Sequence, residues 1–546
     1  MAVKEQNATG QSRDTETAGG LDFDAVIVGA GFAGLYMLHR LRSAGLKTQV
    51  FEAGDGVGGT WYWNLYPGAR CDVPSMEYSY QFDPELQQEW EWTERYASQG
   101  EILKYLEHVA DRYNLRPDIK FNTRVGAARY DDLSNSWIVE TENGDNVKSR
   151  FFIMATGCLS VPYTPNIEGL NDFEGVVCHT GNWPKEGIDA VGKRVGVIGT
   201  GSSGIQVAPM LAEDAEHMFV FQRTPAYSVP SQNRPLDAEE QNTIKARYEE
   251  FRAEAKSNRA GIMYELGQKS ALDCDKEELK REYEIRWEIG GLGFTAAFKD
   301  IFDDVDANNT AAEFVREKIR SIVRNPAVAE ALTPHTLIGC KRLCVSAGYF
   351  ETFNRSNVTL VDLRKEAIER ITKTGIVVGG KEIPLDVIVL ATGFDAITGA
   401  LLRVRIHGKG GIELKQKWAD GPKTYLGHSI AGFPNMFAIT GPGSPSVLSN
   451  LVPSIEQDVN WIGDCIDYMN LHGHQVIEAT SEAEAGWVAH VNKVANKTIY
   501  PLEDSWYVGT NIPGKPRVFL PYIGFPDYVG RCTEVADRGY TGYSLT

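Results

Sequence analysis

The sequence predicts an α/β protein that contains the same strand–turn–helix–strand unit twice. A Gly-x-Gly-x-x-Gly pattern begins at Gly29 and another at Gly199, and each follows a short apolar run. Residues 236–332, after the second pattern, are rich in charge and have helical character. A glycine turn between a buried strand and a helix is typical of Rossmann-like folds. We therefore expect two Rossmann-like dinucleotide-binding domains, the second of which carries a helical insertion.

The periodicity of apolar residues places the elements of each unit. In the first unit, residues 25–28 have the length and composition of a buried strand, and residues 35–41 continue at helical spacing. Residues 48–51 form the next strand. The second unit and the later strands are expected, in chain order, at residues 194–198, 203–212, 218–222, 358–361 and 387–390.

The first unit has the residues that a dinucleotide with a free ribose diol needs. Gly29, Gly31 and Gly34 allow a tight turn, a close approach of the backbone to pyrophosphate and close packing of helix on strand. The N-terminus of the following helix then faces the anion with free N–H groups. Glu52 ends the second strand, where a carboxylate accepts hydrogen bonds from ribose hydroxyls, as in FAD or NAD.

The second unit differs from the first at the strand-end position that would contact the ribose. The residue equivalent to Glu52 is Gln222, followed by Arg223 and Thr224. No acid is available for a ribose diol, and a guanidinium at this place suits a 2′-phosphate. The pattern favours NADPH at the second site and FAD at the first. The alternative for Arg223 is an exposed arginine with no ligand.

Composition narrows the class of protein. A net charge of −18 and a pI near 5.1 disfavour binding to nucleic acid or to anionic membranes. No run of 18 apolar residues is present, and the polar start favours a disordered tail over a signal peptide. The eight cysteines form no C-x-x-C pair and no zinc-ligand spacing with histidine, so we expect no metal site. Reduced thiols favour a cytoplasmic protein.

We expect the chain to divide into interleaved domains. The predicted boundaries are a disordered tail at 1–21, an FAD-binding domain at 22–150 and 390–546, an NADPH-binding domain at 151–235 and 333–389, and a helical insertion at 236–332.

Three further motifs accompany the glycine patterns. Residues 173–184 read FEGVVCHTGNWP, of the form F-x-G-x-x-x-H-x-x-x-W-P, shortly before the second glycine pattern. Residues 58–72 read GGTWYWNLYPGARCD, and Ala-Thr-Gly occurs at 155–157 and at 391–393. This combination resembles the fingerprint of the type I Baeyer–Villiger monooxygenases. The closing Trp-Pro of the linker separates that family from flavin-dependent N- and S-oxygenating monooxygenases, which stay the main alternative.

The resemblance implies a reaction and its reactants. NADPH would reduce FAD, the reduced flavin would bind O₂ as a C4a-peroxyflavin, and the peroxide would convert a ketone, whether aryl, cyclic or linear, to an ester or lactone. No obligatory protein partner is evident. A disulfide reductase would need a redox-active cysteine pair, for which only Cys340 and Cys344 are close in sequence. A binding protein that has lost its flavin is a third alternative.

The resemblance also implies roles for particular residues. Arg342 would lie over the flavin as the catalytic cation, held by Asp72, although a plain structural ion pair is the alternative. Lys341 would join Arg223 at the 2′-phosphate, and a mobile loop around Trp506 would close the site. The cofactor-binding residues expected from the motifs and the resemblance are Gly29, Gly31, Gly34, Glu52, Gly59, Thr60, Trp61, Asp72, Tyr78, Gly199, Thr200, Gly201, Ser202, Ser203, Gly204, Gln206, Arg223, Thr224, Lys341, Arg342 and Trp506.

Other positions concern the linker and the substrate. We expect a linker role, without acid–base chemistry, for His179 and Trp183. The substrate pocket is expected to include Thr60, Val73, Ser446, Val447 and Trp506. Departures from the family pattern, which bear on substrate scope, are Leu65, Pro74, Gly100 and the segment 523–526.

Overall fold

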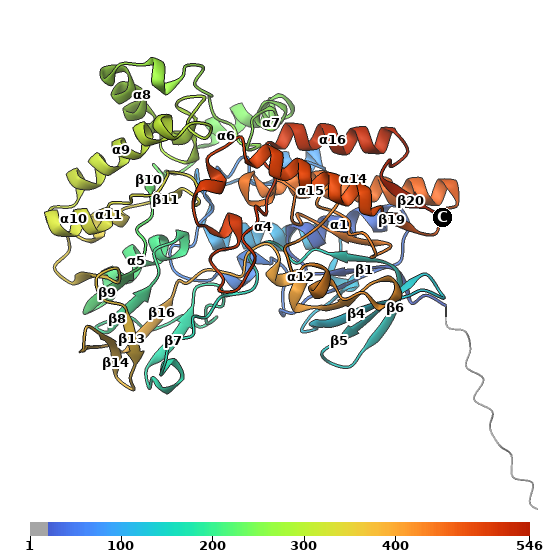
Figure 1. The fold of residues 1–546 in the computed structure, drawn as a ribbon, viewed down its shortest axis with the longest axis horizontal. Coiled ribbons are helices and arrows are strands. Elements are labelled where there is room, and N and C mark those ends of the chain that lie inside the picture. Colours follow the sequence, from blue (N-terminus) through green and yellow to red (C-terminus); the bar gives the residue numbers. More distant parts are fainter. Residues whose placement is uncertain (1–19) are drawn as a thin grey trace, which may run out of the picture.

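The computed structural model describes residues 20–546, so the tail predicted at 1–21 falls almost wholly outside the described residues. Figure 1 shows two sheet-containing lobes side by side, with a group of helices above the second sheet. Within residues 20–546, no helix is both long enough and apolar enough to cross a membrane. The predicted α/β fold is confirmed, and each lobe has a core of parallel strands.

The first lobe is built on an eight-stranded mixed sheet. Strand β1 (Phe23–Val28) pairs in parallel with β2 (Thr48–Phe51) on one side and with β6 (Asn146–Met154) on the other. Helix α1 (Phe32–Ser43) connects β1 to β2, as the sequence predicts. The other strands of this sheet are β3 (Ile119–Lys120), β4 (Val125–Asp131), β5 (Ser136–Thr141), β17 (Arg405–His407) and β18 (Met436–Ala438).

The C-terminal part of the chain returns to the first lobe. Strand β18 pairs with β6, and the long helix α14 (Leu451–His472) packs on α1. The Tyr36 hydroxyl donates to Asn460 Oδ1 at 2.6 Å, and Arg40 forms ion pairs with Asp464 and Asp467. In Figure 1 the helices α14, α15 (Ser481–Ala495) and α16 (Phe525–Asp537) therefore lie beside the N-terminal elements.

The second lobe is built on a five-stranded sheet in the order β12-β9-β8-β16-β7, and every pair in it is parallel. Its central strands are short apolar runs with no exposed face, which is the pattern expected of a parallel sheet covered on both sides. The bounds are β7 (Val176–His179), β8 (Arg194–Ile198), β9 (His217–Gln222), β12 (Val358–Asp362) and β16 (Val387–Leu390), with α5 (Ser202–Asp214) between β8 and β9.

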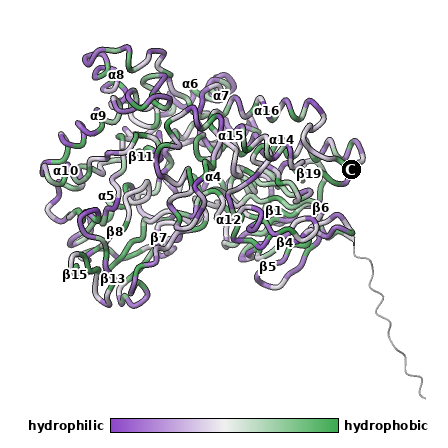
Figure 2. Tube along the Cα trace, in the orientation of Figure 1, coloured by the Kyte–Doolittle hydropathy of each residue, from purple (hydrophilic) through white to green (hydrophobic). Residues whose placement is uncertain are grey.

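Helices dominate the segment between the two parts of the second sheet. Asp237, Asp275, Asp304 and Asn325 each accept backbone N–H groups at a helix start, so their side chains set where these helices begin. Figure 2 shows the outer helix α8 with long hydrophilic stretches, in contrast to the buried strands. The helices are α6 (Ala238–Lys245), α7 (Tyr248–Ser257), α8 (Lys276–Ile289), α9 (Val305–Ile322) and α10 (Pro326–Leu332).

Smaller elements connect the lobes and carry the motifs. The two-stranded parallel pair β10–β11 joins the chain after β9 to the chain that leaves the insertion. The bounds of these and the other short elements are α2 (Thr60–Trp63), α3 (Pro84–Glu89), α4 (Gln99–Arg112), β10 (Ser228–Pro230), β11 (Cys344–Ser346), α11 (Tyr349–Thr352), β13 (Ile368–Ile371), β14 (Gly375–Val378), β15 (Lys381–Pro384), α12 (Gly399–Arg403), α13 (Leu414–Lys417), β19 (Ile477–Ala479) and β20 (Tyr543–Leu545).

Replacing Gly34 by alanine tests how closely α1 packs on the first glycine turn. A methyl carbon there would lie 1.8 Å from the Gly29 carbonyl oxygen, so the backbone would have to move. We expect Gly34→Ala to lower the melting temperature by several degrees. The control is Gly100→Ala in α4, where an added carbon meets nothing within 4 Å and alanine should be neutral or stabilising by about 0.5 kcal/mol. Equal melting temperatures for the wild type and Gly34→Ala would contradict the tight packing.

Candidate active site

The first glycine turn presents an open helix N-terminus. Gly31 is the N-cap of α1 and offers no side-chain cap, so the first backbone N–H groups of the helix are available to an anion. The Gly-Gly-Thr-Trp motif packs directly on this turn, because a carbon added at Gly59 would lie 2.9 Å from the Gly31 Cα. The Trp61 indole N–H donates to the Tyr78 hydroxyl at 3.3 Å, which ties the motif to a second predicted residue.

Glu52 lies where the sequence predicts a ribose-binding acid. Its Oε2 accepts the Ala30 N–H and its Oε1 accepts the Gly54 N–H, both at 2.7 Å. Burial raises the pKa of this carboxyl, and the two backbone N–H groups act in the opposite direction. Each carboxylate oxygen still has a lone pair available. The geometry fits a dinucleotide with an unsubstituted ribose diol.

The second glycine turn is also followed by a helix with a free N-terminus, but the residues at the end of the next strand, β9, differ from those of the first unit. Gly201 caps α5 without a side-chain hydrogen bond. The Thr200 hydroxyl donates to the Thr224 carbonyl at 2.9 Å, which draws the strand end after β9 toward the turn. The Arg223 side chain is exposed beside them. These residues fit a nucleotide that carries an additional phosphate near its ribose.

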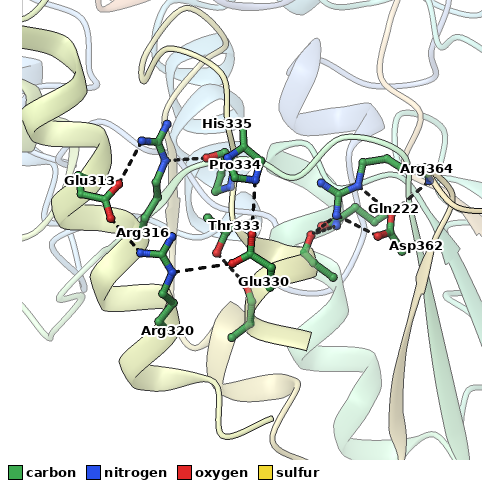
Figure 3. A network of polar contacts seen from close by, with 12 residues as sticks. Gln222, Glu313, Arg316, Arg320, Glu330, Thr333, Pro334, His335, Asp362 and Arg364 are labelled. Atoms are coloured by element: carbon green, nitrogen blue, oxygen red, sulfur yellow. Dashed lines mark hydrogen bonds and ion pairs between the residues drawn. The ribbon is translucent and has the colours of Figure 1, made fainter. Parts of the chain in front are cut away.

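The Gln222 side chain points away from the second glycine turn. Its Nε2 donates to the Ala331 carbonyl at 2.8 Å, and Arg364 donates to the same carbonyl at 2.9 Å while it pairs with Asp362 (Figure 3). The network fixes the end of α10 against β9 and β12. Gln222 therefore fixes the helical insertion in place, and the neighbouring Arg223 is left at the surface.

Lys341 and Arg223 place two cations close together. Burial lowers the pKa of the Lys341 ammonium, Glu503 acts to raise it, and the nearby charge of Arg223 lowers it further. Within residues 20–546, neither side chain has a carboxylate oxygen within 4.0 Å. Glu503 also acts on Lys341, but within the described part of the chain neither cation is engaged in an ion pair of its own, and two such cations suit a multiply charged anion such as a phosphate.

Arg342 and Asp72 form a bidentate ion pair. Arg342 Nε lies 2.6 Å from Asp72 Oδ2 and Nη2 lies 2.7 Å from Oδ1, while Nη1 donates to the Val447 carbonyl at 2.8 Å. Burial acts to lower the pKa of Arg342, but the Asp72 carboxylate more than offsets this and raises it, so the charge is permanent. Three of the five guanidinium N–H groups are used, and two remain for another acceptor.

Two aromatic residues of the C-terminal segment lie near this pair. The Trp506 and Tyr507 ring centroids are 4.4 Å apart, and Tyr507 is buried. Tyr507 belongs to the same buried cluster as Cys340 and Val447, and Trp506 packs against that cluster. Burial raises the pKa of the Tyr507 phenol, and the charge of Arg342 opposes this. The sequence motifs did not single out Tyr507. Its position next to Trp506 is the one signal that was available.

The remaining predicted residues of α5 contact protein groups. The Ser203 hydroxyl hydrogen-bonds to Thr180 at 3.0 Å, and the Ser202 hydroxyl lies 3.6 Å from the Cys344 thiol. The Gln206 amide accepts and donates one hydrogen bond each, to groups of the 58–72 motif. The Gln206 contacts join α5 to the 58–72 motif of the first lobe, whereas Ser202 and Ser203 contact groups outside that lobe.

The linker motif lies against the second sheet. His179 Nδ1 accepts the Gly181 N–H at 2.9 Å, and its Nε2 lies 3.2 Å from the Thr392 hydroxyl. Burial lowers the pKa of the His179 ring. With Trp183 and residues of α2, the motif lines a groove of about 780 Å³. These contacts agree with the predicted linker role.

Comparison with known proteins identifies the family. A family model described as pyridine nucleotide-disulphide oxidoreductase matches residues 26–278. The Baeyer-Villiger monooxygenase of Pseudooceanicola batsensis is 41% identical over 537 residues, which are 97% of this chain and 97% of the relative. The chain belongs to the Baeyer–Villiger monooxygenase family. The family that the motifs predict is thereby confirmed.

Two further matches show the breadth of this family. A phenazine N-monooxygenase of Lysobacter antibioticus is 41% identical, over 96% of this chain and 97% of the relative. A solved structure of oxidised steroid monooxygenase bound to NADP is 52% identical with a TM-score of 0.92, over 96% of this chain and 99% of that one. By its resemblance over nearly the whole chain from about Asp22, the sequence is expected to be most like phenylacetone monooxygenase and somewhat less like steroid monooxygenase. This order stays a prediction.

The cysteines give the disulfide-reductase alternative no support. All eight thiols are free, although the matching family model carries that wider group's description. The Cys340 thiol contacts the Ile499 carbonyl, and the Cys344 thiol contacts Ser202. The two therefore point to different neighbours, and burial raises the pKa of Cys340 to about 12 and of Cys344 to about 11. Neither is poised as a reactive thiolate.

Removing the acid partner of Arg342 tests the ion pair. Asp72→Ala leaves a largely buried guanidinium without its carboxylate, which should destabilise the fold by about 2 kcal/mol. We expect a lower melting temperature for this variant. The control is Asp55→Ala, which breaks the exposed ion pair with Lys185 and should leave the melting temperature unchanged. Equal effects of the two substitutions would contradict the central position of Asp72.

Proposed function

We propose that this chain is an NADPH- and O₂-dependent flavoprotein monooxygenase that converts ketones to esters or lactones. The observation that carries the proposal is the permanently charged Arg342, held by Asp72 with two N–H groups left over, next to Lys341 of the second nucleotide site. Family membership supports the reaction class. The identity of the ketone is left to experiment.

We assign FAD to the first site and NADPH to the second. The chain's resemblance to a solved structure that contains FAD and NADP supports the two cofactors. Glu52 supports FAD because it offers acceptors to a ribose diol, and the pair of Lys341 and Arg223 supports a 2′-phosphate. The residues that we propose as cofactor contacts are Gly29, Gly31, Gly34, Glu52, Gly59, Thr60, Trp61, Asp72, Tyr78, Gly199, Thr200, Gly201, Ser202, Ser203, Gly204, Arg223, Thr224, Lys341, Arg342 and Trp506.

The domain boundaries predicted from the sequence are kept as part of the proposal. They assign 22–150 and 390–546 to the FAD-binding domain, 151–235 and 333–389 to the NADPH-binding domain, and 236–332 to the insertion. A cytoplasmic location and the lack of an obligatory protein partner are proposed with them, on the strongly acidic composition and the eight free thiols.

Bound FAD, reduced by NADPH, supplies the activation of O₂ that this reaction requires. Arg342 contributes a fixed positive charge that stabilises an oxygen anion and the alkoxide formed when oxygen adds to a carbonyl. Asp72 keeps the guanidinium in one orientation through two hydrogen bonds. Tyr507 is buried in the same cluster as Val447, and Trp506 packs against that cluster. These two aromatic residues would limit the access of water to Arg342, and a dry site would protect reactive oxygen from loss as hydrogen peroxide.

N-oxygenation is the second candidate function, because a phenazine N-monooxygenase is as similar to this chain as the Baeyer-Villiger relative. A panel of ketones and of nitrogen heterocycles, assayed for NADPH oxidation with mass analysis of products, separates the two. Ester or lactone products support ketone oxygenation. N-oxides without any ester would overturn it.

Replacing Arg342 tests its proposed role. Arg342→Ala should still allow flavin reduction by NADPH, while ester formation falls by at least about 100-fold because the oxyanion loses its cation. Arg342→Lys keeps the charge but loses the bidentate geometry, and we expect an intermediate rate. Stopped-flow absorbance measures reduction and gas chromatography measures ester. Ester formation by Arg342→Ala near the wild-type rate would remove the catalytic assignment.

Replacing Lys341 tests the nucleotide preference. Lys341→Ala should raise KM for NADPH by about tenfold or more, because one cation of the phosphate site is lost. KM for NADH should stay the same, since NADH lacks the 2′-phosphate. Steady-state kinetics with both nucleotides gives the ratio. A parallel rise of KM for both would show that Lys341 acts elsewhere.

A further inference from the structure

Gln206 occupies an unusual place on the second nucleotide helix. It lies one turn beyond the N-terminus of α5, and both ends of its amide are used across the boundary between the lobes. The Tyr66 hydroxyl donates to Oε1 at 2.7 Å, and Nε2 donates to the Arg70 carbonyl at 3.0 Å. Tyr66 and Arg70 belong to the motif that ends at Asp72.

The backbone of this motif lies directly on α5. Gly68 has a φ of +83°, and a carbon added there would lie 2.6 Å from the Gln206 carbonyl oxygen and 2.8 Å from the Met210 side chain. Only glycine combines this conformation with so close an approach. The segment that leads to Asp72 is therefore fixed to the helix by its backbone as well as by the Gln206 amide.

The same helix also contacts the segment that carries Arg342. The Ser202 hydroxyl, one turn before Gln206, lies 3.6 Å from the thiol of Cys344, two residues after Arg342. Tyr66 belongs to the same buried hydrophobic cluster as Leu343 and Cys344, which directly follow Arg342, so Tyr66 lies beside both segments. Burial raises the pKa of the Tyr66 phenol. The first turn of α5 therefore contacts both the segment that leads to Asp72 and the segment that follows Arg342.

We propose that Gln206 is a positioning residue that couples the nucleotide helix α5 to the Asp72–Arg342 ion pair. This role rests on the proposed function, and it replaces the direct nucleotide contact predicted from the sequence. Gln206 holds the Asp72 segment while Ser202 of the same turn holds the Arg342 segment. Because an error of about 1 Å in the placement of a catalytic group is costly, a helix that positions both partners controls the reaction.

The test uses the FAD-loaded enzyme with Gln206→Met, which keeps the length of the side chain and removes both hydrogen bonds. We expect the NADP⁺ dissociation constant to stay within about twofold of wild type, because the nucleotide contacts remain. Ester formed per NADPH consumed should fall about tenfold, with hydrogen peroxide making up the difference, because the ion pair is misplaced. A weakening of NADP⁺ binding by about tenfold or more would instead identify a nucleotide ligand and overturn the proposal.

Hydrogen exchange provides a readout that does not depend on turnover. In the wild type, NADP⁺ should slow amide exchange in the peptide that contains residues 66–73, and Gln206→Met should abolish that protection although NADP⁺ still binds. Protection that persists in the variant would contradict the coupling. If the wild type forms no ester from any ketone, the proposed function fails, and the exchange experiment still decides the coupling.

Three further variants distinguish this role from a general loss of stability. Tyr66→Phe removes one of the two hydrogen bonds, keeps the ring, and serves if Gln206→Met does not fold. The double variant should be no worse than Gln206→Met, because both act through one contact. The control is Tyr36→Phe, which removes a tyrosine–amide hydrogen bond of 2.6 Å elsewhere in the first lobe. An equal loss of ester yield in Tyr36→Phe would overturn the specific role of Gln206.

Discussion

The ion pair between Asp72 and Arg342 is the interaction on which the rest of the structure depends, because its two partners come from distant parts of the chain. Asp72 ends a motif packed on the first glycine turn, and Arg342 precedes β11 in the second lobe. No local segment can hold their atoms 2.6 Å apart. A largely buried guanidinium without its carboxylate partner lowers the stability of the fold. The fold is therefore stable only when the two lobes are docked so that this ion pair forms.

The two glycine turns show how one unit serves two purposes. Both end in helices without side-chain caps, and both keep the backbone close through glycine. The difference arises at a single strand end. Glu52 is buried and directed at its own turn by two backbone N–H groups, whereas Gln222 is drawn away by the Ala331 carbonyl and Arg223 is left at the surface. In the function that we propose, this one difference at a strand end, with a new partner for the side chain, decides which ribose each turn accepts.

The sequence was sufficient for whatever is local. The apolar runs and the glycine spacing predict the strands and the helix of each unit, and the position of Glu52 at the end of the second strand predicts that it is the acid near the ribose. Contacts between segments far apart in sequence were beyond it. The amino-acid sequence does not indicate that the Gln206 amide forms hydrogen bonds with Tyr66 and Arg70, because a glutamine after a glycine turn is equally suited to contact a nucleotide. Tyr507 was missed for the same reason: its burial near Arg342 depends on the return of the C-terminal segment.

The groups that hold Arg342 are different from the side chains that are expected to line the substrate pocket. The Val447 carbonyl, not its side chain, accepts the third hydrogen bond of Arg342, and the preceding Ser446 holds the left-handed conformation, with φ +47°, that directs this loop. The backbone thus supports the guanidinium, and the side chains of the loop can vary without loss of that bond. Relatives whose names range from steroid to phenazine oxygenation share this fold at 52% and 41% identity. If Arg342 is the catalytic cation that we propose, its support by one backbone carbonyl and one carboxylate allows that variety, because the Val447 side chain takes no part in its three hydrogen bonds.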